Sequence, residues 1–307
     1  MADKIKKFIP WSLFISFLLL FGAITQWPDD NVHIIACDVG QGDGTLIIHQ
    51  FTQVVIDGGP NSNIVNCLSE HMPFWDKTIE LAVMTHPDYD HYRGLIDLVE
   101  GYQVSQMVAN NISKDNSSFW QLQNLVIDHQ IPVYAPSRGD QINAGQLKFT
   151  VLHPSSKIGD IALWQNYPII TDQETNQSTL SAVLGAYSGD ANEASITLLL
   201  DFEDVEILLT GDIGSRSEQA LVGEGLITDV EVLKVAHHGS KFSTSSEFLG
   251  ASLPEIALIS VGAKNTYGHP TSDTLNRLDT VGAKILRTDQ LGTIELITDG
   301  EKIWQKP

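Results

Sequence analysis

The chain has few basic residues for its 307-residue length. Lysine and arginine number 18 against 38 aspartates and glutamates, so the formal net charge is −20. No run of lysine or arginine occurs outside the first seven residues. Proteins that bind long duplex DNA neutralise its phosphates with clustered cations. We therefore expect no binding to long duplex DNA.

Cysteine is also scarce, and a familiar nucleophile motif is missing. Cys37 and Cys67 are the two cysteines of the sequence. They could pair in an oxidising compartment. Cys37, however, ends an apolar run that predicts a buried strand, so we expect free thiols. No Gly-x-Ser-x-Gly sequence is present, so nothing indicates a serine nucleophile at a strand-to-helix turn.

One segment near the N-terminus is long, apolar and uncharged. It covers residues 8–27, follows three lysines within the first seven residues, and has about the length that a bilayer-spanning helix needs. The lysines favour a cytoplasmic N-terminus. A cleaved signal peptide is the alternative, although no clean small-x-small site follows. We expect residues 1–30 to be a single-pass inner-membrane anchor, with residues 31–307 as one domain on the periplasmic, extracytoplasmic side.

The pattern of the remaining residues predicts the α/β class. Short apolar runs alternate with helix-like stretches, of which 118–129, 215–224 and 271–281 are the clearest. The length suits one large domain with an ample core. Residues 155–191 are polar and weakly periodic, which predicts an inserted loop. A substrate lid and a disordered segment both remain open for this loop.

Residues 86–91 read His-Pro-Asp-Tyr-Asp-His and follow a short apolar run. They place four metal-competent side chains within six residues, where a strand should end and a helix begin. Imidazole and carboxylate groups together suit zinc, manganese or iron. The alternative is a polar turn with a helix cap. The candidate ligands are His86, Asp88, Asp90 and His91.

Further histidines and aspartates follow other apolar runs along the chain. Because α/β proteins collect their sites at the ends of strands, these residues are expected at one edge of a sheet. So many ligand-competent residues would be enough for two metal ions that share a bridging carboxylate. They are Asp43, Asp57, His153, Asp212, His237, His238 and His269.

Several stretches resemble one known family. They read DVGQGDGTLI (38–47), IDGG (56–59), THPDYDHYRGL (85–95), TGDI (210–213), LKVAHHGSKFSTSSEFL (233–249) and ISVGAKNTYGHP (259–270). The chain resembles the metallo-β-lactamase superfamily, most closely the hydrolase domain of ComEC-type competence proteins. The resemblance implies a four-layer αββα sandwich. The superfamily usually has histidine at position 88, and the aspartate found here recurs in the competence branch.

The resemblance also implies a role for each candidate. Two divalent metal ions, zinc or manganese, would be the cofactors. One would be held by His86, Asp88 and His153, the other by Asp90, His91 and His237, and Asp212 would bridge them. The catalytic assignments are Asp90, His238 as a substrate contact and His269 on the leaving-group side, although the order of His237 and His238 stays open. Asp43 and Asp57 would hold ligating histidines by their second ring nitrogen.

These features predict a metal-dependent hydrolase that uses a metal-bound hydroxide. Such a site suits a phosphodiester, either a small molecule or single-stranded DNA, so phosphodiesterase and nuclease are the two expected activities. Ser240, Lys241 and Ser243 could contact phosphate, or could simply cap the following helix. The alternative function is a non-catalytic, metal-binding accessory module of a DNA-uptake or envelope complex. β-Lactam hydrolysis is a distant third.

Overall fold

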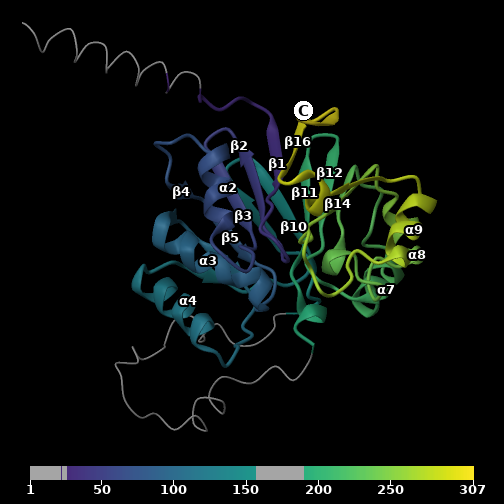
Figure 1. Cartoon of the computed structure of the whole chain (residues 1–307), viewed down its shortest axis with the longest axis horizontal. Coiled ribbons are helices and arrows are strands. Elements are labelled where there is room, and N and C mark those ends of the chain that lie inside the picture. Colours follow the sequence, from purple (N-terminus) through teal and green to yellow (C-terminus); the bar gives the residue numbers. More distant parts are fainter. Residues whose placement is uncertain (1–21, 23–25, 157–189) are drawn as a thin grey trace, which may run out of the picture.

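The computed structural model describes residues 22, 26–156 and 190–307, and two mixed β-sheets form its centre (Figure 1). The predicted membrane anchor and the predicted loop 155–191 fall almost entirely outside these residues. Within the described part, no helix has both the length and the apolar character needed to cross a bilayer.

The first sheet has eight strands. From the edge formed by the C-terminal strand as far as β3, neighbours are antiparallel, and from β3 onward they are parallel. In sheet order the strands are β17 (Ile303–Gln305), β16 (Ile294–Thr298), β1 (Val32–Ala36), β2 (Thr45–His49), β3 (Thr52–Ile56), β5 (Leu81–Met84), β7 (Met107–Ala109) and β8 (Val133–Tyr134). Two short parallel strands, β4 (Thr78–Ile79) and β6 (Gln103–Val104), pair separately.

The second sheet has seven strands and the same mixture. β12 to β15 are parallel to one another, and β9 to β12 are antiparallel. In sheet order they are β15 (Lys284–Arg287), β14 (Ile256–Ile259), β13 (Val232–Lys234), β12 (Val205–Leu209), β11 (Thr197–Phe202), β10 (Leu147–His153) and β9 (Gln141–Ala144).

Helices cover the outer face of each sheet, which completes four layers (Figure 1). The first sheet carries α2 (Asn63–His71), α3 (Tyr89–Gly101) and α4 (Ser117–Asp128), and the second carries α7 (Ser215–Gly223), α8 (Ser246–Ser252) and α9 (Ser272–Thr280). Short helices α10 (Thr288–Leu291), η1 (Asn192–Ala194) and η2 (Ala236–Gly239) lie in connections. The predicted αββα sandwich is confirmed.

Three apolar clusters hold the layers together. Successive side chains of a strand point to opposite faces of the sheet. Ile35 of β1 therefore packs under the first set of helices, whereas Ile34 packs between the sheets. Leu208 and Leu233 of the second sheet pack in the same way under α7 and α8. Both faces of both sheets are buried, which is why these strands are nearly continuous apolar runs.

A glycine contact fixes helix α3 against the end of β3. The amide of Gly58 donates to the carbonyl of His91 at 2.6 Å, and the amide of Gly94 donates to the carbonyl of Gly59 at 2.8 Å. A Cβ atom added at Gly94 would lie 1.9 Å from the carbonyl oxygen of Gly58. Only glycine permits this approach, which brings the start of α3 next to the turn that carries Asp57.

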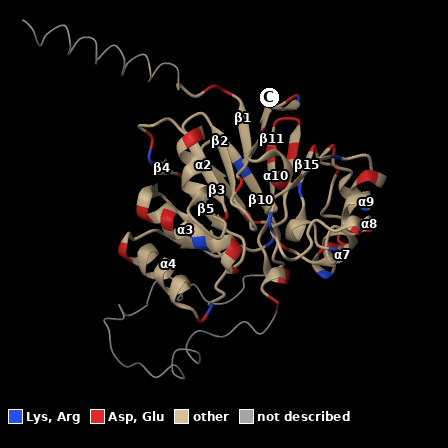
Figure 2. Ribbon diagram, viewed as in Figure 1, with Lys and Arg blue, Asp and Glu red and all other residues tan. Residues whose placement is uncertain are grey.

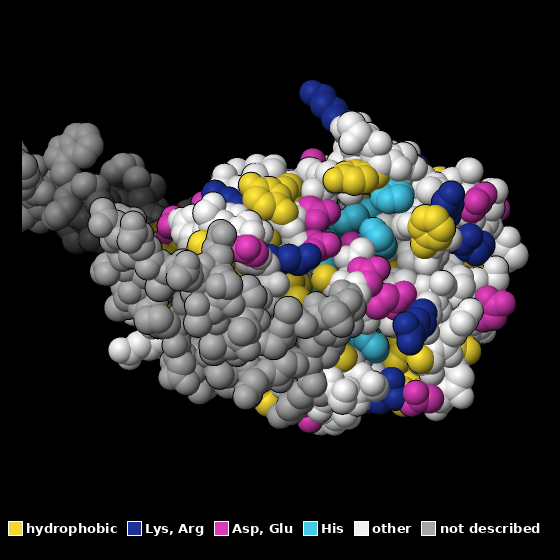
Figure 3. All heavy atoms as spheres, turned by 90° about the horizontal axis from the view of Figure 1, so that it is seen from below, with side chains coloured by type: hydrophobic (Ala, Val, Ile, Leu, Met, Phe, Trp, Pro, Cys, Tyr) yellow, Lys and Arg dark blue, Asp and Glu magenta, His cyan; other side chains and the backbone are white. Residues whose placement is uncertain are grey.

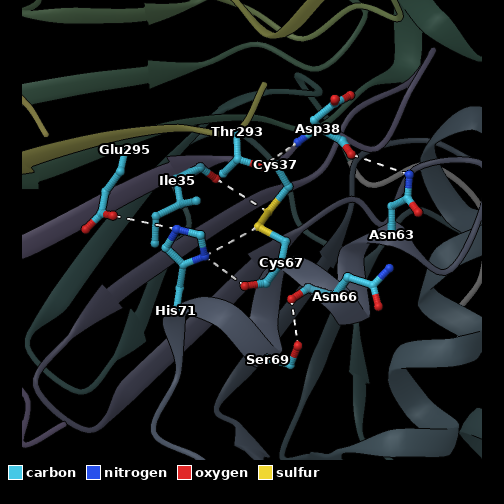
Figure 4. The surroundings of a disulfide bond; sticks show 10 residues. All are labelled: Ile35, Cys37, Asp38, Asn63, Asn66, Cys67, Ser69, His71, Thr293 and Glu295. Carbon is cyan, nitrogen blue, oxygen red and sulfur yellow. Dashed lines mark hydrogen bonds and ion pairs between the residues drawn. A yellow bond between two sulfur atoms is a disulfide. The ribbon is translucent and has the colours of Figure 1, made fainter. Parts of the chain in front are cut away.

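The two cysteines form a disulfide, so the expectation of free thiols was wrong. Helix α2 packs over the end of β1 and brings the two Cα atoms to 5.9 Å. Figure 4 shows His71 pointing toward Cys67 on one side and Glu295 on the other. Cys37 is buried and still forms a disulfide, because the helix that covers it, α2, carries Cys67.

Replacing Gly94 by alanine should lower the free energy of unfolding by more than about 2 kcal/mol, because backbone atoms that cannot move aside block the new methyl group. Gly101→Ala on the same helix is the matched control. No atom lies within 4 Å of its added Cβ, so stability should stay unchanged or rise by up to about 1 kcal/mol. Equal urea-unfolding midpoints for the two variants would refute the close contact.

Candidate metal centre

Three buried histidines meet at the edge where strands of both sheets end. His86 follows β5, His91 lies in the first turn of α3, and His238 lies in η2 after β13. Each is at most 2% exposed, and each has an Nε2 atom without a hydrogen-bond partner. Oδ1 of buried Asp212, in the turn after β12, also lacks a partner. Buried polar atoms are nearly always paired, so four unpaired atoms in one place indicate a missing partner.

The spacing of these atoms suits a divalent cation. Oδ2 of Asp212 lies 3.3 Å from Nε2 of His91 and 3.6 Å from Nε2 of His238. Oδ2 of Asp90, in the first turn of α3, lies 3.4 Å from Nε2 of His238. Ligand atoms bound at about 2.1 Å to one ion are roughly 3 to 3.5 Å apart. Among the described residues, four groups of side chains are close enough to hold a metal, and Asp212 belongs to two of them. They are His86, His91 and Asp212; Asp90, His91 and His238; Asp43, Asp57 and His91; and Asp43, Asp212 and His238.

Hydrogen bonds on the opposite ring nitrogens orient two of these histidines. Nδ1 of His91 donates to Oδ2 of Asp57 at 2.8 Å, and Nδ1 of His238 donates to the carbonyl of Ser260 at 2.9 Å. Such bonds fix the ring and leave Nε2 to face a metal. The sequence predicted this role for Asp57, but it gave no reason to choose Ser260, which acts through its backbone.

Hydroxyl groups surround the third histidine. Nδ1 of His86 lies 3.1 Å from Oγ1 of Thr85 and 3.2 Å from Oγ of Ser195. Thr85 donates from this hydroxyl to Asp57 at 2.7 Å, and Ser195 accepts from the amide of Asp212 at 3.1 Å. The sequence did not indicate Ser195 as a site residue, because it lies before a strand, whereas the other candidates follow the ends of strands. It reaches the site because β11 is antiparallel to its neighbours.

Asp43 forms a buried ion pair that sequence reasoning missed. Nζ of Lys234, which is 4% exposed, lies 2.7 Å from Oδ2 of Asp43, and Oδ1 of Asp43 lies 3.4 Å from Nδ1 of His238. Burial raises the pKa of Asp43, but Lys234 and His238 outweigh it and lower the pKa below its ordinary value. The overlooked signal was a lysine within the apolar run of β13, since a buried lysine needs a partner.

The structure distinguishes the two adjacent histidines, whose order the sequence left open. The resemblance placed His237 as the metal ligand and His238 as a substrate contact. The structure instead buries His238 within the ligand groups, whereas the His237 side chain is 31% exposed and its Nε2 lies 4.0 Å from Asp212. Both residues have left-handed backbones, with φ of 51° and 53°. This tight turn sends the second ring, rather than the first, into the site.

In the described part of the chain, Asp88 and His153 do not join His86 in the metal-ligand group that the resemblance implied. Oδ2 of Asp88 lies 3.7 Å from Nε2 of His86, but its Oδ1 pairs with Nζ of Lys114 at 2.6 Å. Both neighbours lower the pKa of Asp88. Nε2 of His153 donates to the backbone carbonyl of Glu193 at 2.8 Å, and His153 belongs to none of the potential metal groups among the described residues.

The carboxylates around the histidines make the site strongly attractive to cations. Burial lowers the pKa of His238, but the charges of Asp212 and Asp43 outweigh it and raise the pKa to about 10. For Asp212, burial raises the pKa, but the charges of His91 and His238 outweigh burial and lower the pKa below its ordinary value. Without a metal, protons therefore compensate these carboxylates. A divalent cation would replace the protons, so metal binding should release them.

The remaining candidates lie farther from the buried ligands. The ring of His269 is 5.9 Å from that of His237, and Asn265 holds the loop by accepting from the amide of His269. Ser240 and Ser243 are buried and bonded within their own turn, and a different serine, Ser245, caps α8. The first two serines therefore do not cap this helix, and phosphate contact by Ser240, Lys241 and Ser243 stays a prediction.

Residues 37–263 match the family model described as the metallo-beta-lactamase superfamily. The chain belongs to this superfamily. ComE operon protein 3 of Bacillus subtilis is 27% identical over 276 residues, which cover 84% of this chain. Competence protein ComA of Neisseria gonorrhoeae is 40% identical over 107 residues, or 34% of the chain. The expected resemblance to competence proteins is thereby confirmed.

These relatives are much longer proteins, since the matched regions cover 32% and 16% of their lengths. Among solved structures, CmlA, a diiron β-hydroxylase from Streptomyces venezuelae, has a TM-score of 0.52 at 13% identity, covering 85% of this chain and 53% of CmlA. YhfI of Bacillus subtilis, a metallo-beta-lactamase fold protein, has a TM-score of 0.50 at 10% identity, covering 90% of this chain and all of YhfI. These likenesses show the fold. The fold binds divalent metals, usually two.

The two adjacent histidines provide a sharp test of the ligand geometry. His238→Ala should weaken zinc or manganese binding by more than the roughly 10- to 100-fold that loss of an orienting partner costs, because it removes a buried ligand atom. His237→Ala should leave the affinity near that of the unchanged protein. Calorimetric titration of metal-depleted protein measures both. If His237→Ala instead weakens metal binding more than His238→Ala does, His237 is the ligand, as the resemblance implied.

Proposed function

We propose that this protein is a divalent-metal-dependent hydrolase of phosphodiesters. The observation that carries the proposal is the set of buried, unpaired ligand atoms on His86, His91, His238 and Asp212. Divalent cations bound there would acidify water and neutralise the negative charge that a phosphoryl group gains during hydrolysis. A module that bound no metal would have no need to keep these atoms unpaired in its interior.

The residues divide between holding cations and handling the substrate. His86, His91, His238 and Asp212 would hold the ions, and Asp90 would complete the set beside His238. The turns behind them keep the rings fixed, so the site is organised before substrate arrives. Burial, followed by the charge of His237, lowers the pKa of His269. The lowered pKa reduces the protonated fraction of His269 at neutral pH, so proton donation from it to a leaving group should increase as the pH falls toward that pKa.

Charge and similarity together favour a single-stranded nucleic acid or a nucleotide as substrate. The relatives are named as competence and recombination proteins. Figure 2 shows lysine and arginine positions scattered along the described ribbon among more numerous acidic positions. Long duplex DNA would find few cations with which to exchange its counterions. A short or flexible phosphodiester needs only the metal centre and its immediate rim.

We also infer that the hydrolase domain lies on the extracytoplasmic side of the inner membrane, attached through residues 8–27. The lysines before this segment favour a cytoplasmic N-terminus, and the Cys37–Cys67 disulfide suits an oxidising compartment. Alkaline phosphatase fused after Pro307 should then be active and membrane-bound. An active soluble fusion would indicate cleavage of the segment, and an inactive fusion would place the domain in the cytoplasm.

Matched substrates test the reaction and the role of His269. The p-nitrophenyl and phenyl esters of thymidine 5′-phosphate differ in how much the leaving group needs a proton. His269→Ala should slow the phenyl ester by about 10²- to 10⁴-fold and the p-nitrophenyl ester far less. Asp212→Ala should abolish turnover of both, since it removes a shared ligand.

The controls separate the two parts of this proposal. Equal losses on both esters in His269→Ala would remove the acid role and leave the hydrolase intact. If the metal-loaded protein turns over neither ester nor short single-stranded DNA, the hydrolase proposal fails. The accessory-module function, with metal binding but no hydrolysis, would then account for the centre.

A further inference from the structure

Three large aromatic side chains are exposed beside the metal centre. Tyr89 lies between two of its carboxylates and is 53% exposed. Phe242 follows the histidine turn and Tyr267 precedes His269, and each is 69% exposed. Figure 3 shows histidine and acidic side chains gathered on this face, with hydrophobic side chains around them. Exposed rings grouped at one site suggest a binding role, because packing of the core does not require them.

A series of ring contacts joins Tyr267 to the buried ligands. The centroids of His238 and His237 are 6.3 Å apart, those of His237 and His269 are 5.9 Å apart, and those of His269 and Tyr267 are 6.1 Å apart. The last pair is stacked, with 11° between the ring planes. Exposure rises along the series from 2% for His238 to 69% for Tyr267. A substrate held at the metals would therefore extend outward along an aromatic surface.

Two lysines near this site already pair with carboxylates of the protein, and a third lies beside an aromatic ring. Lys114 pairs with Asp88 at 2.6 Å, Lys234 pairs with Asp43 at 2.7 Å, and Nζ of Lys241 lies 5.0 Å from the centre of the Phe242 ring. With a net charge of −20, attraction to phosphates contributes little affinity. Stacking of a base on an aromatic ring contributes about 1–3 kcal/mol and does not depend on such cations. Bases paired within a duplex do not offer their faces for it.

We propose that Tyr267, stacked on His269, selects substrates that carry an unpaired nucleobase next to the scissile phosphodiester. The base stacks on the exposed face of the tyrosine ring while the phosphodiester lies at the metal centre. Tyr89, at the start of α3, and Phe242, in the turn after η2, would contact neighbouring bases. This inference rests on the proposed phosphodiesterase function and names the feature of the substrate that the site recognises.

Two oligomers of equal length and charge test the proposal, namely oligothymidylate and its abasic tetrahydrofuran analogue. Tyr267→Ala should raise KM for oligothymidylate by roughly 5- to 100-fold with little change in kcat, because stacking contributes equally before and during the reaction. The effect on the abasic oligomer should be much smaller. Tyr267→Phe, which keeps the ring, should retain the preference for oligothymidylate.

The control variant is Phe51→Ala, which removes an exposed ring in the β2–β3 turn. It should leave KM unchanged for both oligothymidylate and the abasic oligomer. Fluorescence anisotropy of the labelled oligomers provides a readout that needs no turnover. Preferential binding of oligothymidylate, lost in Tyr267→Ala, supports the inference even if the hydrolase proposal fails. Equal effects of Tyr267→Ala on the two oligomers, or none on either, would overturn the inference even if phosphodiester hydrolysis is confirmed.

Discussion

The structure depends on one electrostatic constraint, the meeting of buried imidazoles and carboxylates where the two sheets end. Asp57 and Asp212 are almost fully buried and come from different sheets, with His91 between them. Isolated buried charges cost several kcal/mol, so such a group persists only when other charges compensate it. Lys234 compensates the charge of Asp43 but does not pair with Asp57 or Asp212. The remainder requires protons or cations, and the unpaired ligand atoms favour cations.

The fold supplies this arrangement through the directions of its strands. β3 and β5 are parallel in the first sheet, and β12, β13 and β14 are parallel in the second, so the turns that follow them collect at a common edge. The contact between Gly58 and Gly94 then sets the depth of α3, which delivers His91. Asp57, His237 and His238 have positive φ angles, so three left-handed residues lie at this edge.

Much of this could be predicted from the sequence, because apolar runs and the polar residues after them are local signals. β5 begins and ends where its apolar run does, and α4 differs from its predicted limits by one residue at each end. The four-layer class followed from the resemblance of the motifs. The pairing of β16 with β1 was not visible, because it joins segments more than 250 residues apart. The Cys37–Cys67 disulfide was missed for a different reason, because the buried strand end at Cys37 indicated a free thiol, whereas the helix that covers it carries Cys67.

The site was predictable as a set of residues but not as a geometry. His86, His91 and Asp212 come together with unpaired ligand atoms. The choice between His237 and His238 depended on two left-handed residues, which no periodic pattern reveals. The partners of Asp88 and His153, Lys114 and a backbone carbonyl, come from distant segments. Contacts of that kind arise only from tertiary structure.

The most direct test is a crystal structure of the protein grown with zinc or manganese, with anomalous scattering recorded at the metal edge. The account predicts an anomalous peak within bonding distance, about 2.0–2.2 Å, of Nε2 of His91 and a carboxylate oxygen of Asp212. His86 or His238 should complete its coordination. No peak at this edge of the sheets, or one coordinated by other side chains while these Nε2 atoms bind water, would contradict it.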